Sequence, residues 1–121
     1  MTLRRRIEEQ IQREIIQYIS AVIPRSLVFS VPNAAPRTWG GRASNGVPGL
    51  MKGAPDLIAV MPGGRVLFIE VKTPKGSSSD DQFAFSGRCR ALGQAYFVAR
   101  SLDDCRRAFA ALGIETREVQ P

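Results

Sequence analysis

The sequence predicts an α/β fold in which a central mixed β-sheet is flanked by α-helices. Apolar runs of strand length alternate with segments whose apolar residues recur every three or four positions, and Pro or Gly separates them. At 121 residues the chain is long enough for one domain with a single core, over residues 1–121. Its composition, 44% hydrophobic and 23% charged, is that of an ordinary globular domain.

The first half of the chain predicts a helix, a strand and a long irregular loop. The helix is expected over residues 3–20 because one side is apolar, through Leu3, Ile7, Ile11, Ile15, Tyr18 and Ile19. Residues 27–31 have strand composition and stop at Pro32. Residues 33–54 hold five glycines and few large apolar residues, which predicts a loop that either has a function or is a simple connector.

The second half predicts two paired strands followed by helices that alternate with strands. Residues 56–61 and 65–72 are expected to form a hairpin through Pro62-Gly63-Gly64. The later elements are marked by caps. They are a helix over 80–92 between Ser79 and Gly93, a strand over 95–99, a helix from Ser101 to Gly113 with Asp103 and Asp104 in its first turn, and an edge strand over 114–119.

The charge and the missing residue types narrow the classes of function. A formal charge of +6 and a pI near 10.2 favour nucleic acid as a partner over simple solubility charge. The absence of histidine excludes Ser-His-Asp and Cys-His catalysis and histidine-ligated zinc. Cys89 and Cys105 lack metal-ligand spacing, so we expect free thiols rather than a disulfide. No apolar stretch reaches the roughly 18 residues of a membrane span, and Arg4-Arg5-Arg6 precedes no signal-peptide core, so we expect a cytoplasmic protein.

The most informative motif is Glu70-Val71-Lys72, which ends the apolar run Val66-Leu67-Phe68-Ile69. Alternation in a strand places Glu70 and Lys72 on one face, and the hairpin would bring in Asp56, which lies fourteen positions earlier. Mg²⁺ in proteins takes one or two carboxylates together with substrate phosphates. Two acids and a lysine therefore suit a metal-dependent nuclease, whereas the simpler alternative is a salt bridge on a surface strand.

These motifs resemble the PD-(D/E)XK nuclease superfamily, and more narrowly its VRR-NUC family, in the short form found alone in phages and bacteria. The resemblance rests on Gly53-Ala54-Pro55-Asp56-Leu57 and Phe68-Ile69-Glu70-Val71-Lys72, with Ser79-Asp80-Asp81-Gln82 and Gly93 to Ala99 after them. It extends from about Glu8 to Ala108, although the chain has no Val-Arg-Arg triplet. It implies a restriction-endonuclease-like sheet.

The resemblance also implies a set of catalytic residues. Asp56, Glu70 and the backbone carbonyl of Val71 would bind Mg²⁺ or Mn²⁺, and Lys72 would activate water or neutralise charge on the phosphate. A glutamate on the first helix would complete the site, with Glu8 preferred to Glu9. Gln82 would contact the water, the lysine or a phosphate, unless it is a solvent-facing residue beside the cap at Ser79.

By the same resemblance, the expected function is a structure-selective DNA endonuclease that resolves four-way (Holliday) junctions as a homodimer in a bacterial or phage-infected cell. No membrane and no nucleotide cofactor are expected. The alternatives are the same chemistry on flap, single-stranded or duplex DNA, and a binding module without catalysis. Contacts with DNA are expected from Asn33, Arg37, Trp39, Arg42 and Lys52. Asn33 could instead form a turn, and Trp39 could anchor the loop to the core.

Overall fold

A computed structural model describes residues 2–32, 38–39, 42–43 and 48–117. The helices in these residues are α1 (Leu3–Val22), α2 (Asp80–Ala91) and α3 (Leu102–Ala111). The strands are β1 (Leu27–Ser30), β2 (Thr38–Trp39), β3 (Arg42–Ala43), β4 (Leu57–Val60), β5 (Val66–Val71) and β6 (Ala95–Ala99). Every helix expected from the sequence is present, and so are the four longer strands.

The main sheet has the strand order β1-β4-β5-β6 and is mixed, as predicted. β1, β4 and β5 are antiparallel neighbours, whereas β6 runs parallel to β5. A parallel pair needs a crossover, and α2 supplies it between β5 and β6. The strand that ends in Glu70 and Val71 is therefore an inner strand with partners on both sides.

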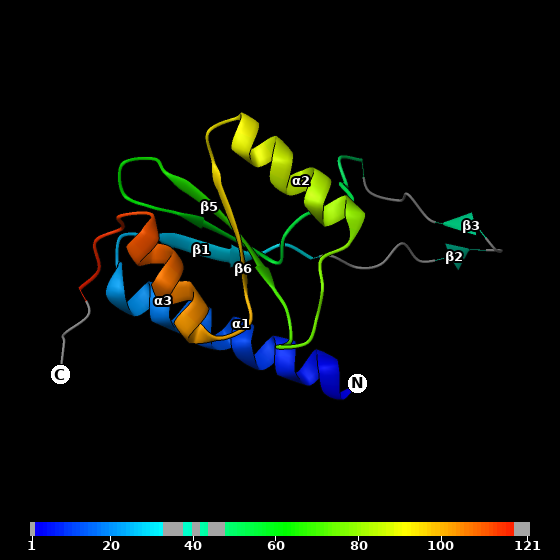
Figure 1. Ribbon diagram of the computed structural model, residues 1–121, viewed down its shortest axis with the longest axis horizontal. Helices are drawn as coiled ribbons and strands as arrows, with labels where there is room; N and C mark the ends of the chain where they lie inside the picture. Colours follow the sequence, from blue (N-terminus) through cyan, green and yellow to red (C-terminus); the bar gives the residue numbers. More distant parts are fainter. Residues whose placement is uncertain (1, 33–37, 40–41, 44–47, 118–121) are drawn as a thin grey trace.

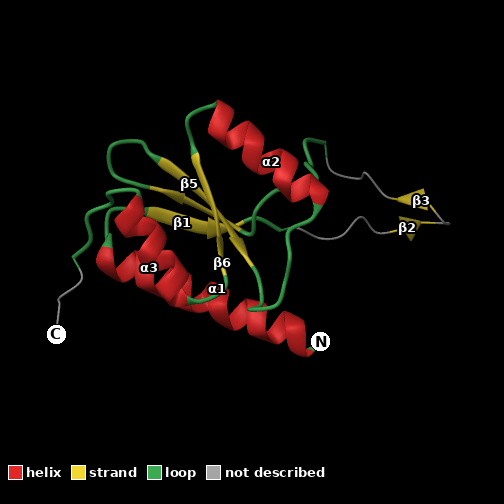
Figure 2. Ribbon diagram, viewed as in Figure 1, coloured by secondary structure: helices red, strands yellow, loops and turns green. Residues whose placement is uncertain are grey.

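Helices cover both faces of this sheet (Figures 1 and 2). α1 and α3 pack on one face, where Ile15, Ile19 and Phe109 meet alternate residues of the strands in the apolar core. α2 covers part of the other face, and its Phe85 contacts Phe68 of β5 and Tyr96 of β6. Alternation along β5 thus directs Leu67, Ile69 and Val71 into the main core, and Phe68 and Glu70 toward the face that carries α2.

Helix caps fix where the chain leaves the sheet. Ser79 and Gln82 form a reciprocal capping box at the start of α2, and Ser101 accepts the Asp104 N–H at the start of α3. Gly93 and Gly113 have positive φ just after these two helices, which allows the chain to turn back. The caps predicted at Ser79 and Ser101 are confirmed.

Two expectations need correction. Residues 114–117 are not a strand, because this segment lies beside the end of α1, where the Arg117 N–H bonds Val22 O; residues 118–119 lie outside the described part. The segment 33–54 is not wholly irregular, because β2 and β3 form a short antiparallel pair with Trp39 opposite Arg42.

Two further expectations can be compared with the structure. Cys89 and Cys105 are both buried free thiols, as predicted. In the part of the chain that the structure describes, no helix combines the length and apolarity needed to cross a bilayer.

Candidate functional site

Asp56 lies directly before β4 and opposite Glu70. The pairing of Leu57 with Ile69 continues outward to place Asp56 across from Glu70 in the antiparallel register. Backbone groups of both neighbouring segments hold Asp56, since its carbonyl accepts the Val31 N–H at 2.8 Å and its Oδ2 accepts the Val71 N–H at 2.8 Å. The residue therefore joins the end of β1 to the end of β5.

Glu70 is a buried acid with incomplete pairing. Its exposed fraction is 3%, although it faces away from the main apolar core. Oε2 lies 3.8 Å from Nζ of Lys72, which is an ion-pair distance but too long for a hydrogen bond. Oε1 is buried and has no hydrogen-bond partner among the described residues. A buried carboxylate oxygen in this condition is costly unless a proton, a cation or water serves it.

The surroundings of Glu70 raise its pKa from the ordinary 4.5 to about 8. Burial is the largest cause, and the charge of the neighbouring Asp56 carboxylate adds to it. The charge of Glu8 raises the pKa further, while Lys72 acts in the opposite direction. Without a cation, the ionised form of Glu70 is thus disfavoured, and a positive charge beside the acid pair would favour it.

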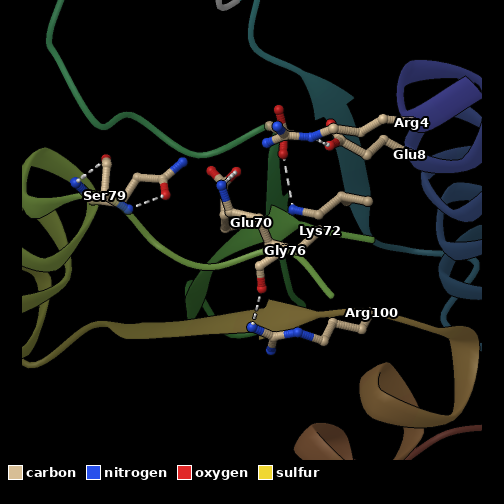
Figure 3. A network of polar contacts seen from close by, with 10 residues as sticks. Arg4, Glu8, Glu70, Lys72, Gly76, Ser79 and Arg100 are labelled. Atoms are coloured by element: carbon tan, nitrogen blue, oxygen red, sulfur yellow. Dashed lines mark hydrogen bonds and ion pairs between the residues drawn. The ribbon is translucent and has the colours of Figure 1, made fainter. Parts of the chain in front are cut away.

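Lys72 follows β5 on the same side of the chain as Glu70. It is 7% exposed, and its backbone N–H bonds Ala99 O at 3.0 Å beyond the end of the parallel pair. This bond fixes the backbone at the point where β5 ends. The ammonium is consequently kept beside the acid pair, as Figure 3 shows for Glu70 and Lys72.

Of the two helix acids considered, Glu8 is the one whose charge reaches Glu70. Its side chain is 29% exposed, and its Oε1 accepts the Arg4 Nε–H at 3.1 Å (Figure 3). Glu9 is 47% exposed and lies 4.0 Å from Arg5. Both acids line one hollow of about 750 Å³ together with Asp56. The electrostatic contact with Glu70 distinguishes Glu8 from its neighbour.

Gln82 lies in the first turn of α2, where its side chain completes the capping box. Its Oε1 accepts the Ser79 N–H at 2.9 Å, and its own backbone N–H bonds Ser79 Oγ at 3.2 Å. The cap engages the oxygen of the amide, which leaves the amide nitrogen as the group for water or phosphate. Gln82 lies in the first turn of its helix, as expected, while its contact with water, Lys72 or a phosphate remains a prediction.

The carboxylate oxygens at this site suit a hard divalent cation as ligands, but they are few. Asp56 and Glu70 are adjacent carboxylates, and no residue that the structure describes bonds Glu70 Oε1. Among the described residues, no group of three or more Asp, Glu, Cys or His side chains is gathered closely enough to hold a metal. An ion here would need the backbone, water or substrate for its other ligands, which is the usual manner of Mg²⁺.

The expected DNA contacts lie mostly in the part of the chain where little is described. Asn33 and Arg37 fall outside the described residues. Trp39 and Arg42 are partners in the β2–β3 pair. Lys52 is exposed in the segment that leads to Asp56. These residues stay predictions.

Two residues near the site were not assigned a role from the sequence. The hydroxyl of Tyr96 is buried without a partner among the described residues, and burial followed by the charges of Glu70 and Asp56 raises its pKa. Arg100 donates through its guanidinium to Gly76 O at 2.7 Å, which ties the loop after Lys72 to the end of β6 (Figure 3). No sequence pattern places Tyr96 beside the acid pair, because its position depends on its parallel alignment with Phe68.

Comparisons with known proteins agree with this geometry. The family model described as "VRR-NUC domain" matches residues 3–103. A solved structure titled "VRR_NUC domain" has a TM-score of 0.62 and 24% sequence identity, covering 86% of this chain and 95% of that chain. At this identity the likeness concerns the fold. No curated protein matches the chain.

Proposed function

The chain belongs to the VRR-NUC family, and we propose that it is a metal-dependent endonuclease that hydrolyses phosphodiester bonds in DNA. The observation that carries this proposal is Glu70, a buried carboxylate opposite Asp56 with one oxygen that has no hydrogen-bond partner in the described part of the chain. A solely structural acid on an inner strand would be expected to have both oxygens satisfied. The family's nuclease-type fold supports DNA as the partner.

The groups present fit Mg²⁺ or Mn²⁺ as cofactor. Asp56 and Glu70 would hold the ion, with the carbonyl of Val71 as a further oxygen ligand. Such an ion supplies Lewis-acid stabilisation of the phosphate and lowers the pKa of water. The raised pKa of Glu70, to about 8, agrees with a site that lacks a positive charge when only the chain is present.

The neighbouring side chains would then position the attacking water and neutralise charge on the phosphate. Lys72 holds its ammonium 3.8 Å from Glu70 Oε2, where it can orient water or offset charge that develops on the phosphate. Glu8 adds an acid from α1, and the Gln82 amide nitrogen can donate to phosphate or water. Each role places a donor or a charge where the reaction needs one, so each can be tested by a substitution that preserves shape.

Branched DNA, and four-way junctions in particular, is the preferred substrate within this proposal. Symmetric cutting of a junction needs two sites, so a homodimer is part of it. A bacterial or phage-infected cytoplasm would supply both the DNA and the cation. Flap, single-stranded and duplex DNA are alternative substrates for the same chemistry. A binding module without catalysis is the alternative from another class, and the costly burial of Glu70 counts against it.

The deciding experiment is a cleavage panel on four-way junction, flap, single-stranded and duplex DNA with Mg²⁺, Mn²⁺ or chelator. Glu70→Ala should abolish cleavage while binding of DNA, which depends mainly on basic side chains, stays nearly unchanged. Glu115→Ala, an exposed acid beyond α3, is the control and should cleave normally. Absence of metal-dependent cleavage on every substrate, or full activity in Glu70→Ala, would refute the proposal.

A further inference from the structure

Lys72 lies where the regular structure of β5 ends, and the turn that follows it packs against its side chain. Residues 72–79 link β5 to α2 without a helix or strand. The Gly76 N–H bonds Thr73 O at 3.0 Å, which closes residues 73–76 into a turn. A Cβ on Gly76 would lie 3.5 Å from Cβ of Lys72. The turn therefore folds back onto the lysine.

This packing matters because backbone bonds do not hold the ammonium of a lysine in place. The charge of lysine lies at the end of a flexible four-carbon stem. The bond of the Lys72 N–H to Ala99 O, at 3.0 Å, fixes only the start of that stem. The side chain is nevertheless 9% exposed, with Nζ 3.8 Å from Glu70 Oε2. Its stem is thus covered by neighbouring structure, and the turn 73–76 contacts it at Cβ.

Arg100 bonds this turn on the side away from Lys72. Its Nη2 donates to Gly76 O at 2.7 Å, and Gly76 lies between Lys72 and Arg100 in Figure 3. A hydrogen bond from a charged donor is shorter and stronger than one between neutral groups. The bond joins the turn to a residue that lies 24 positions away in the sequence. It ties the chain between β5 and α2 to the end of β6.

The backbone of Arg100 is itself fixed. Arg100 follows β6 directly, and the parallel register of β5 with β6 places it beside Lys72. Its N–H bonds Asp104 Oδ2 at 2.8 Å, in the first turn of α3. The Asp104 N–H in turn bonds Ser101 Oγ, the cap of that helix, at 3.1 Å. The guanidinium is therefore carried by the sheet and by a capped helix start, and through it the turn 73–76 is joined to both.

We propose that Arg100 is a positioning residue for Lys72, which holds the turn 73–76 against the lysine stem and so keeps the ammonium at the acid pair. The inference rests on the proposed nuclease function and adds a residue that acts on cleavage through Lys72 rather than through DNA. Loss of the bond to Gly76 O should slow the chemical step and leave the affinity for DNA nearly unchanged. A residue that only bound a phosphate would have the opposite effect.

The first test separates rate from affinity. Arg100→Met removes the donor and keeps an unbranched stem. Cleavage in single turnovers, with the protein in saturating excess over the DNA, should slow about 10- to 100-fold, as expected when a catalytic group is displaced by about 1 Å. Binding of DNA, measured by fluorescence anisotropy with Ca²⁺, should weaken about twofold, the effect of one lost charge. Arg100→Lys, which keeps a charged donor, should cleave faster than Arg100→Met. A loss of affinity with an unchanged rate would overturn the positioning role.

The second test observes Lys72 without DNA or metal, by NMR of the whole chain with ¹³C-labelled lysine. The chain has three lysines, and Lys72→Met identifies the signal of Lys72. The two protons on its Cε should have separate shifts because the stem is fixed, whereas the exposed Lys52 and Lys75 should each give one averaged shift. Arg100→Met should merge the two shifts of Lys72. Arg90→Met, which removes an exposed arginine in the last turn of α2, is the matched control and should change neither these shifts nor the cleavage rate.

Failure of the positioning role and failure of the proposed function give different results. Separate Lys72 shifts or an unchanged cleavage rate in Arg100→Met, with cleavage that still depends on Glu70, would overturn the positioning role and keep the nuclease assignment. Merged shifts in a chain that cleaves no DNA with Mg²⁺ or Mn²⁺ would keep Arg100 as the residue that positions Lys72 and refute the nuclease assignment. Circular dichroism checks the fold of each variant. If Arg100→Met does not fold, Arg100→Gln, which lacks the charge and the reach, takes its place in both tests.

Discussion

The raised pKa of Glu70 predicts that the metal-free protein loses stability as the pH rises. An acid whose folded pKa is about 8, against an ordinary 4.5, binds its proton more tightly in the folded chain. Its contribution is fully present below about pH 4.5 and is lost progressively up to about pH 8. At ~1.4 kcal/mol per unit of pKa, the free energy of unfolding is about 3 kcal/mol lower at pH 7 than at low pH, because the unfolded chain has released this proton and the folded chain still binds it. The loss reaches about 5 kcal/mol above pH 8, where the folded chain ionises too.

Glu70→Gln removes this dependence, because glutamine has nearly the same shape and does not ionise. In chelator, the free energy of unfolding of the wild type should fall between pH 5 and pH 8 by about 3 to 4 kcal/mol more than that of the variant. Urea unfolding followed by far-ultraviolet circular dichroism measures both. Comparing the two pH values within each protein cancels any fixed cost of burying the glutamine amide.

Mg²⁺ should restore the wild type at pH 8 and leave Glu70→Gln unchanged, because a cation that binds only the folded state stabilises it by mass action. Glu115→Gln, which alters an exposed acid, should follow the wild type throughout. If the wild type and Glu70→Gln showed the same change with pH in chelator, the assignment of Glu70 as a buried acid that lacks a countercharge would be wrong.

Three further substitutions test the remaining parts of the site. Lys72→Met should abolish cleavage but keep binding of Mn²⁺ by calorimetry, and an unchanged rate would exclude Lys72 from the mechanism. Gly53→Ala should lower the melting temperature well below that of Gly49→Ala, because both glycines have positive φ but only at Gly53 would a Cβ lie 2.2 Å from Asp81 O. Tyr96→Phe should raise the free energy of unfolding in urea by about 1 kcal/mol, since it removes a buried hydroxyl that has no partner among the residues described; a lower value would indicate a partner elsewhere in the chain.

Much of this fold could be predicted because local signals and tertiary structure agree. Alternation in Val66–Val71 and the glycines at the preceding turn specify a hairpin, and that hairpin alone brings Asp56 opposite Glu70. Ser79 and Ser101 mark the starts of α2 and α3 by capping chemistry that depends on only a few residues. The central motif could be found for the same reason.

Features that depend on distant segments could not be predicted. The apolar stripe of α1 begins at Leu3, yet Leu3 is 73% exposed. The spacing of apolar residues along a helix does not show where the sheet beneath that helix ends. The segment 114–117 has strand composition but pairs its Arg117 N–H with Val22 O instead of a strand. The position of Tyr96 follows from the alignment of β6 with β5, which the sequence of either strand does not specify.

The two carboxylates of the acid pair differ in how the protein holds them. Asp56 is tied twice, through its carbonyl to Val31 and through Oδ2 to the Val71 N–H, so its side chain closes the sheet where β4 has not yet begun. Among the residues that the structure describes, Glu70 has no comparable bond to the backbone, and its burial disfavours the ionised form. Replacing Asp56 by Ala would leave the Val71 N–H without its acceptor, so lost cleavage in that variant would mix structural damage with lost chemistry. Asp56→Asn retains an oxygen for that N–H, and Glu70→Gln retains the packing. Activity lost in both, with the fold retained, would therefore belong to the charge of the pair rather than to the architecture that holds it.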